Sequence, residues 1–149
     1  DGLLRAGDFA VQLPLNEMVE HGAELRAWDI AQIFEFFAAL SAYDYPRCAA
    51  ALNRMSEREL SGAAFHAFCG NFLELYADFK DRTVAEVSLT RKMMQTIKLG
   101  VLSGMVFEKG IFAIIRSLMY LDGMVLRCNP DAILLRDMRP FIGEFEKRV

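Results

Sequence analysis

One acidic residue of this sequence stands where a carboxylate could do chemistry. Asp8 follows a short apolar stretch at Leu3-Leu4, which we expect to be a strand, and precedes Phe9 and the small residue Ala10. An aspartate at the end of a strand, followed by Phe and a small residue, can hold Mg²⁺ against the phosphates of a nucleotide. Asp8 is therefore a candidate metal ligand, although such a tripeptide also arises by chance.

The two histidines do not predict a site. His21 has Glu17 and Glu20 nearby, but their spacing matches no metal-ligand pattern, so we interpret His21 as a solvated loop residue. We expect His66 at the surface or half-buried beside a stripe of phenylalanines. The sequence contains no Walker-type phosphate loop, H-E-x-x-H or G-x-S-x-G motif, and we assign no catalytic residue to it.

Sulfur-containing side chains also favour a structural interpretation. Cys48, Cys69 and Cys128 are far apart and odd in number, which argues against a disulfide framework or a zinc site. We expect them to be small buried residues in a reducing, intracellular compartment. Five methionines could line an adaptable groove for a lipid or a partner, although core packing is the commoner use: Met93, Met94, Met105, Met119 and Met124.

Composition places the chain among compact proteins with one core. Of its 149 residues 54% are hydrophobic, with 12 Phe and 8 Met against 4 Pro, and its net charge is -3. No basic stripe with interleaved aromatic residues occurs, so we expect no nucleic-acid partner. The longest apolar run, residues 110–126, contains Arg116 and Asp122. We interpret it as a buried core helix and not as a membrane span, because central charges are costly in a bilayer.

Apolar residues recur at the helical period along most of the chain after residue 25. We expect a first helix at about 26–42 with a stripe at Ile33, Phe34 and Phe37, and a second at about 46–55. A third helix should start at Ser56, which forms an S-x-x-E capping box, or at Ser61. Its apolar stripe runs from 65 to 79 and should end near residue 80.

Three further helices complete the expected architecture. A connector at 83–88, with a second capping box at Thr83 and Glu86, leads to a helix that stops at 103–104. A fifth helix at about 108–127 is apolar on most faces and should be the most buried. The last, at about 132–147, should kink or break at Pro140. We thus predict a nearly all-α chain in two parts: residues 1–25 with strand, D-F-A motif and loop, and a domain of about six helices at 26–149.

Several short segments follow one another in a definite order: residues 2–10 (strand and D-F-A), 36–45 (aromatic run and Tyr-Asp-Tyr), 84–88 (V-A-E-V-S), 118–123 (L-M-Y-L-D-G), 129–131 (N-P-D) and 139–141 (R-P-F). In this order they resemble segments of the UbiB/AarF family of atypical kinase-like proteins. In that family an apolar strand leads to a D-F-G motif, and a helical C-terminal region follows. Ala10 stands where the family has Gly, Asp122 replaces a Glu, and residues 15–25 look like an insertion.

The resemblance implies that the chain is the helical C-terminal part of a protein-kinase-like C-lobe. The chain starts at Asp1, not Met, and we expect an upstream nucleotide-binding lobe as its partner, with a membrane surface or self-association as further contacts. The parent protein would be an atypical kinase or ATPase of ubiquinone or isoprenoid-lipid metabolism, peripheral to a membrane. Its Mg²⁺, held by Asp8, and ATP would not bind to this chain alone. The alternatives are a stand-alone helical interaction module and a carrier of apolar ligands such as lipids.

Overall fold

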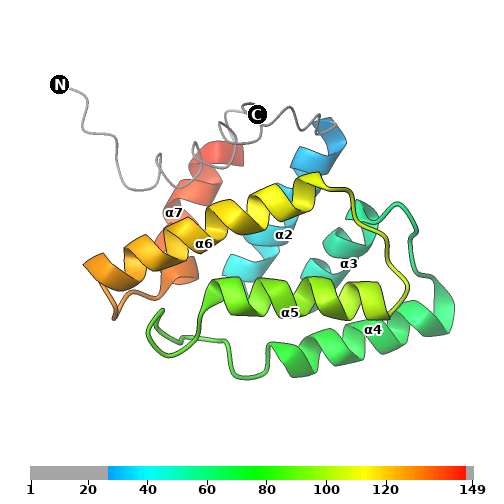
Figure 1. Ribbon diagram of the computed structural model, residues 1–149, viewed down its shortest axis with the longest axis horizontal. Helices are drawn as coiled ribbons and strands as arrows, with labels where there is room; N and C mark the ends of the chain where they lie inside the picture. Colours follow the sequence, from blue (N-terminus) through cyan, green and yellow to red (C-terminus); the bar gives the residue numbers. More distant parts are fainter. Residues whose placement is uncertain (1–26, 147–149) are drawn as a thin grey trace.

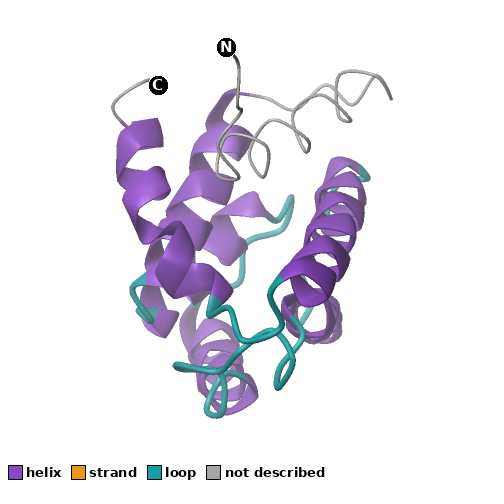
Figure 2. Cartoon of the chain, turned by 90° about the vertical axis from the view of Figure 1, so that its left-hand side faces the viewer, coloured by secondary structure: helices purple, strands orange, loops and turns teal. Residues whose placement is uncertain are grey.

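The computed structural model describes residues 27–146, which form six α-helices and no strand (Figures 1 and 2). The helices are α2 (Ala27–Ser41), α3 (Tyr45–Met55), α4 (Gly62–Leu75), α5 (Leu89–Leu102), α6 (Gly110–Cys128) and α7 (Leu134–Glu146). The expected all-α class is therefore confirmed for this part of the chain. The expected strand at Leu3-Leu4, with the rest of residues 1–25, lies outside the described residues.

From α2 to α6, each helix packs against the next one in sequence, and the last helix, α7, packs against the first, α2. α2 packs against α3 and α7, α3 against α4, α4 against α5, and α5 against α6. In Figure 1, α6 crosses the front of the molecule and runs antiparallel to α5, with α7 behind it. None of the helices in residues 27–146 is long and apolar enough to cross a bilayer.

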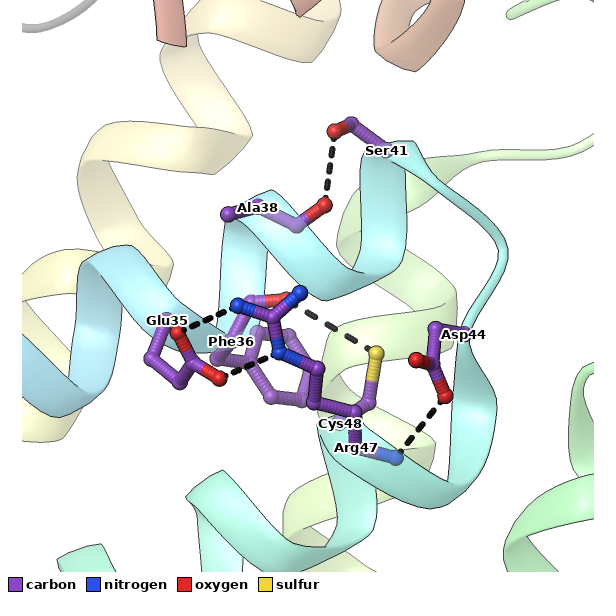
Figure 3. A network of polar contacts seen from close by, with 7 residues as sticks. All are labelled: Glu35, Phe36, Ala38, Ser41, Asp44, Arg47 and Cys48. Atoms are coloured by element: carbon purple, nitrogen blue, oxygen red, sulfur yellow. Dashed lines mark hydrogen bonds and ion pairs between the residues drawn. The ribbon is translucent and has the colours of Figure 1, made fainter. Parts of the chain in front are cut away.

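The corner between α2 and α3 is held by side chains of both helices (Figure 3). Asp44 caps α3 by accepting a hydrogen bond from the backbone N–H of Arg47 (3.2 Å). The Arg47 guanidinium binds both carboxylate oxygens of Glu35 on α2, and this contact lowers the pKa of Glu35. The Cys48 thiol donates to the Phe36 carbonyl at 3.7 Å, and burial raises the pKa of Cys48 to about 12. This thiol therefore stays protonated and packs as a small apolar group.

A group of aromatic rings forms the centre of the core. Phe72 on α4 stacks on Tyr76 with ring centroids 4.7 Å apart, and Phe36 on α2 meets Phe72 edge-on at 6.4 Å. Tyr45 on α3 lies 5.5 Å from Tyr76. The Tyr76 hydroxyl forms a 2.8 Å hydrogen bond with Oγ1 of Thr96 on α5, and burial raises the pKa of Tyr76. Tyr76 thus contacts residues of α3, α4 and α5 directly and is joined to α2 through Phe72. The predicted phenylalanine stripe is confirmed as core.

Of the two expected starts of the third helix, Ser61 is confirmed and Ser56 is wrong, because α4 begins directly after Ser61. The expected end near residue 80 is also wrong, because α4 ends at Leu75. The hydroxyl of Ser56 instead donates to the Arg58 carbonyl (2.7 Å) and accepts from the Val106 N–H (2.9 Å), so it serves a loop contact. After α4 the chain makes turns, and Asp81 takes a left-handed φ of 58°, which a helix cannot contain.

The connector expected at residues 83–88 is confirmed, and Thr83 and Glu86 exchange the expected capping-box hydrogen bonds (2.9 and 3.3 Å), which close a turn there. The expectation about the last helix needs correction. α7 begins at Leu134 and continues through Pro140 without a break. Packing of α7 against α2 offsets the backbone hydrogen bond that a proline cannot donate.

Burial differs from expectation where helices are apolar on most faces. α2 buries Phe36, Ala39 and Leu40, while its expected stripe is only half-buried. α6 is not the most buried helix, because it exposes five large apolar side chains: Phe112, Met119, Tyr120, Met124 and Leu126. All three cysteines are free, but Cys48 alone is fully buried, whereas Cys69 is half-buried and Cys128 is exposed. Periodicity cannot select an inner face when apolar residues surround the helix.

The role of Tyr76 can be tested by truncation. Tyr76→Phe loses only the hydrogen bond to Thr96, so the free energy of unfolding should fall by about 1 kcal/mol. Tyr76→Ala also leaves a cavity and should cost about 3–5 kcal/mol. Urea denaturation measures both, and Tyr120→Phe on exposed Tyr120 (62%) is the control that should change nothing. If Tyr76→Ala has the same free energy of unfolding as the wild type, the aromatic rings do not stabilise the core.

Candidate functional site

The predicted metal ligand Asp8 lies outside the described residues, as do Phe9, Ala10 and His21. Within residues 27–146, no group of three or more His, Cys, Asp or Glu side chains could hold a metal ion. His66 is exposed on α4, as expected. Besides the contacts of the α2–α3 corner and the ion pair of Lys92 with Asp78, three clusters of polar contacts join separate elements of the described chain.

The first cluster is a buried carboxylate on α6 that binds the start of α5. Asp122 is 9% exposed, and its Oδ2 accepts hydrogen bonds from the Ser88 hydroxyl (2.6 Å) and the Thr90 N–H (3.4 Å). The Ser88 oxygen also accepts from the Arg91 N–H (3.2 Å) and so caps α5. The other oxygen of Asp122, Oδ1, is buried without a hydrogen-bond partner among the described residues. One serine thus both starts α5 and ties it to α6.

The second cluster surrounds the turn after α2. Tyr43 has a left-handed φ of 58°, and its hydroxyl accepts from the Asp81 N–H (3.2 Å) and donates to the Asp81 carboxylate (3.3 Å). Arg139 on α7 lies 5.3 Å from the centre of the Tyr43 ring and donates to the carbonyl of Ser41, while the Lys80 ammonium is 5.7 Å from the same ring. Strained backbone of this kind persists where the surrounding contacts hold it. Here they come from α7 and from the loop after α4.

The third cluster joins two connectors by backbone hydrogen bonds. The Val84 N–H donates to the Ala132 carbonyl (2.9 Å), and the Ala85 N–H donates to the Pro130 carbonyl (3.2 Å). A mostly apolar hollow lies beside them, lined by Tyr43, Phe79, Arg82, Val84, Val87, Leu89, Ile133, Leu134 and Leu135. These contacts fasten the turn before α7 to the segment before α5.

These clusters act as anchors between helices. Asp122, Ser88 and Arg139 each bind a group on another element, so their chemistry is attachment and orientation. Sequence analysis missed all three roles. A carboxylate within an apolar run, as Asp122 is, was the available signal for a buried polar partner, because such a charge must be compensated.

Two N-cap serines provide a matched test of the first cluster. Ser88→Ala removes the α5 cap and the shortest hydrogen bond to the buried Asp122 carboxylate, so unfolding should become easier by about 2 kcal/mol. Ser61 caps α4 by position but makes no side-chain capping bond, so Ser61→Ala should cost less than about 0.5 kcal/mol. Equal losses in chemical denaturation would contradict the anchoring role of Ser88.

Two arginines of α7 test the second cluster in the same way. Arg139→Ala loses the bond to the Ser41 carbonyl and the contact with the Tyr43 ring, and should lower the free energy of unfolding by about 1 kcal/mol. Arg136 is exposed and contacts only the neighbouring Asp137 carboxylate among the ion pairs described, so Arg136→Ala should stay within about 0.5 kcal/mol of wild type. Thermal unfolding would rank the two variants, and the reverse order would refute the assignment.

Comparison of the chain with protein-family models, with curated proteins and with solved structures gave no match.

Proposed function

We propose that this chain is the helical C-terminal part of an atypical kinase- or ATPase-like protein of the UbiB/AarF kind, linked to quinone or isoprenoid-lipid metabolism. The supporting observation is that the segments that carry the resemblance bind one another although they are far apart in sequence. Ser88 of the V-A-E-V-S segment binds Asp122 of the L-M-Y-L-D-G segment. Ala85 of the former binds Pro130 of the N-P-D turn.

The remaining pair of segments meets in the second cluster. Arg139, which opens the R-P-F segment, contacts the Tyr43 ring and the carbonyl of Ser41 beside the Tyr-Asp-Tyr turn. Each of these contacts needs a particular group: a hydroxyl that caps and donates, a carboxylate that accepts, a guanidinium over a ring. These contacts give a physical reason for the quoted residue types to occur together in one chain, and in that sense they support the proposal.

In this proposal residues 27–146 are a scaffold and a partner surface, and Asp8 supplies the one metal-binding group of the chain. Phosphoryl transfer depends on holding phosphates, metal and nucleophile together. A single carboxylate cannot position all three, so the nucleotide lobe and catalytic loop would come from upstream sequence. A hard cation such as Mg²⁺ prefers anionic oxygen ligands, which is the role proposed for the Asp8 carboxylate.

Asp8→Asn in the intact parent protein tests the proposal. Asparagine keeps the shape but removes the charge, so Mg·ATP binding in calorimetry should weaken by about tenfold or more while the melting temperature is unchanged. Glu17→Gln neutralises another carboxylate of the same part of the chain and should leave both quantities at wild-type values. If Asp8→Asn binds Mg·ATP with normal affinity but melts at a lower temperature, Asp8 is a turn or cap residue and the proposal is refuted.

A stand-alone helical interaction module is the second candidate function, and the exposed apolar side chains of α6 favour it. The two candidates differ in what the parent sequence must contain upstream. The first requires the nucleotide-binding lobe of the resembled family, with its K-x-G-Q segment, and its D-x-x-x-x-N catalytic loop, whereas the second requires neither. A lipid-carrying cavity lined by the phenylalanine stripe is not favoured, because Phe68, Phe72 and Tyr76 pack directly on each other with ring centroids 4.7–6.0 Å apart.

A further inference from the structure

The outward side of α6 carries large apolar and basic side chains together. Residues on one side of a helix are three or four positions apart in sequence. The exposed residues of α6 that follow this spacing, together with Tyr120 next to them, are called the outer face of α6: Phe112, Arg116, Met119, Tyr120, Gly123 and Arg127. Phe112 is 50% exposed, Met119 52% and Tyr120 62%. The opposite side of the helix supplies core residues, among them Ile114, Leu118 and Leu121.

Such a face is unusual for a helix at the surface of a domain. A surface helix normally turns polar and charged residues of both signs outward, and a helix that is apolar on both sides is normally covered on both sides. α5, which runs antiparallel to α6, likewise exposes Met94, Val101 and Leu102. The outer face of α6 therefore has the composition of a contact surface.

Charge identifies the kind of contact. Residues 89–128, which span α5 and α6, contain six Lys or Arg and two Asp or Glu, whereas the whole chain has a net charge of -3. Of the two acidic residues, Asp122 is buried and Glu108 is half-buried before α6 begins. Of the six basic residues, Lys92 is ion-paired with Asp78 (2.6 Å). Positive charge still exceeds negative charge on the two helices that expose apolar side chains, which suits an anionic partner.

We propose that the outer face of α6 lies on the surface of a bilayer that contains anionic lipids, with the helix axis along the membrane plane. Phe112, Met119 and Tyr120 would enter the boundary between headgroups and acyl chains, as in other amphipathic interfacial helices. Arg116 and Arg127 would bind anionic headgroups while their methylene stems cover apolar surface. A second copy on this face is disfavoured, because a symmetric contact would bring arginines of like charge together.

Vesicle flotation of the full chain tests this proposal. The chain should float with vesicles of phosphatidylcholine mixed with phosphatidylserine, much less with phosphatidylcholine alone, and less in high salt. Arg116→Gln and Arg127→Gln should each lower the partition coefficient about fivefold, which corresponds to ~1 kcal/mol per basic residue. Phe112→Ser and Tyr120→Ser should lower it at every salt concentration, because they remove the part of the binding that salt does not screen.

Two substitutions on other helices serve as matched controls. Arg54→Gln neutralises an exposed arginine on α3, and Leu73→Ser removes an apolar side chain of α4 that is 43% exposed; both should bind vesicles as the wild type does. Circular dichroism of each variant verifies that it is folded. The proposal is overturned if the wild type ignores anionic vesicles, if the controls lose binding as much as the α6 variants, or if sedimentation shows a dimer that the α6 variants dissociate. These outcomes concern α5 and α6 only, so they leave the kinase-like function untouched.

Discussion

Tyr76 lies just beyond the last residue of α4, with its ring buried against Phe72 and Tyr45 and its hydroxyl bonded to Thr96 of α5. A tyrosine in this position combines a large apolar area with a hydroxyl that must find a partner once it is buried. The ring joins α3 to α4 and, through Phe72, reaches Phe36 of α2. The hydroxyl bonds α5 to this group, and α6 in turn packs on α5.

α5 in turn determines how α6 is oriented. The Ser88–Asp122 hydrogen bond and the packing of Ile114, Leu118 and Leu121 commit one side of α6 to the core. The opposite side, with Arg116 and its apolar neighbours, then has to face outward. The proposed membrane contact thus depends on the same buried groups that hold the fold together, although none of them would touch lipid.

Local patterns predicted the parts of this structure that short-range physics controls. The helical class, the phenylalanine stripe of α4, the turn at Ser103-Gly104 and the Pro46 start of α3 were all expected, and the structure has them. Each depends on residues within a few positions of one another: a repeat of 3.6 residues, a cap, a glycine at positive φ, a proline in a first turn. All the residues that produce such a pattern lie in one short segment, so the pattern can be recognised without knowing the tertiary structure.

By itself, then, the sequence determined that residues 27–146 are built from helices and where most of these helices begin and end. Only the tertiary structure decided which sides of α2 and α6 face inward, because both helices are apolar around most of their circumference. It also decided the pairings of Ser88 with Asp122 and of Arg139 with Ser41, which are separated by 34 and 98 positions. Hydrogen bonds over such separations depend on the packing of every helix between them, and no local pattern of residues contains that information.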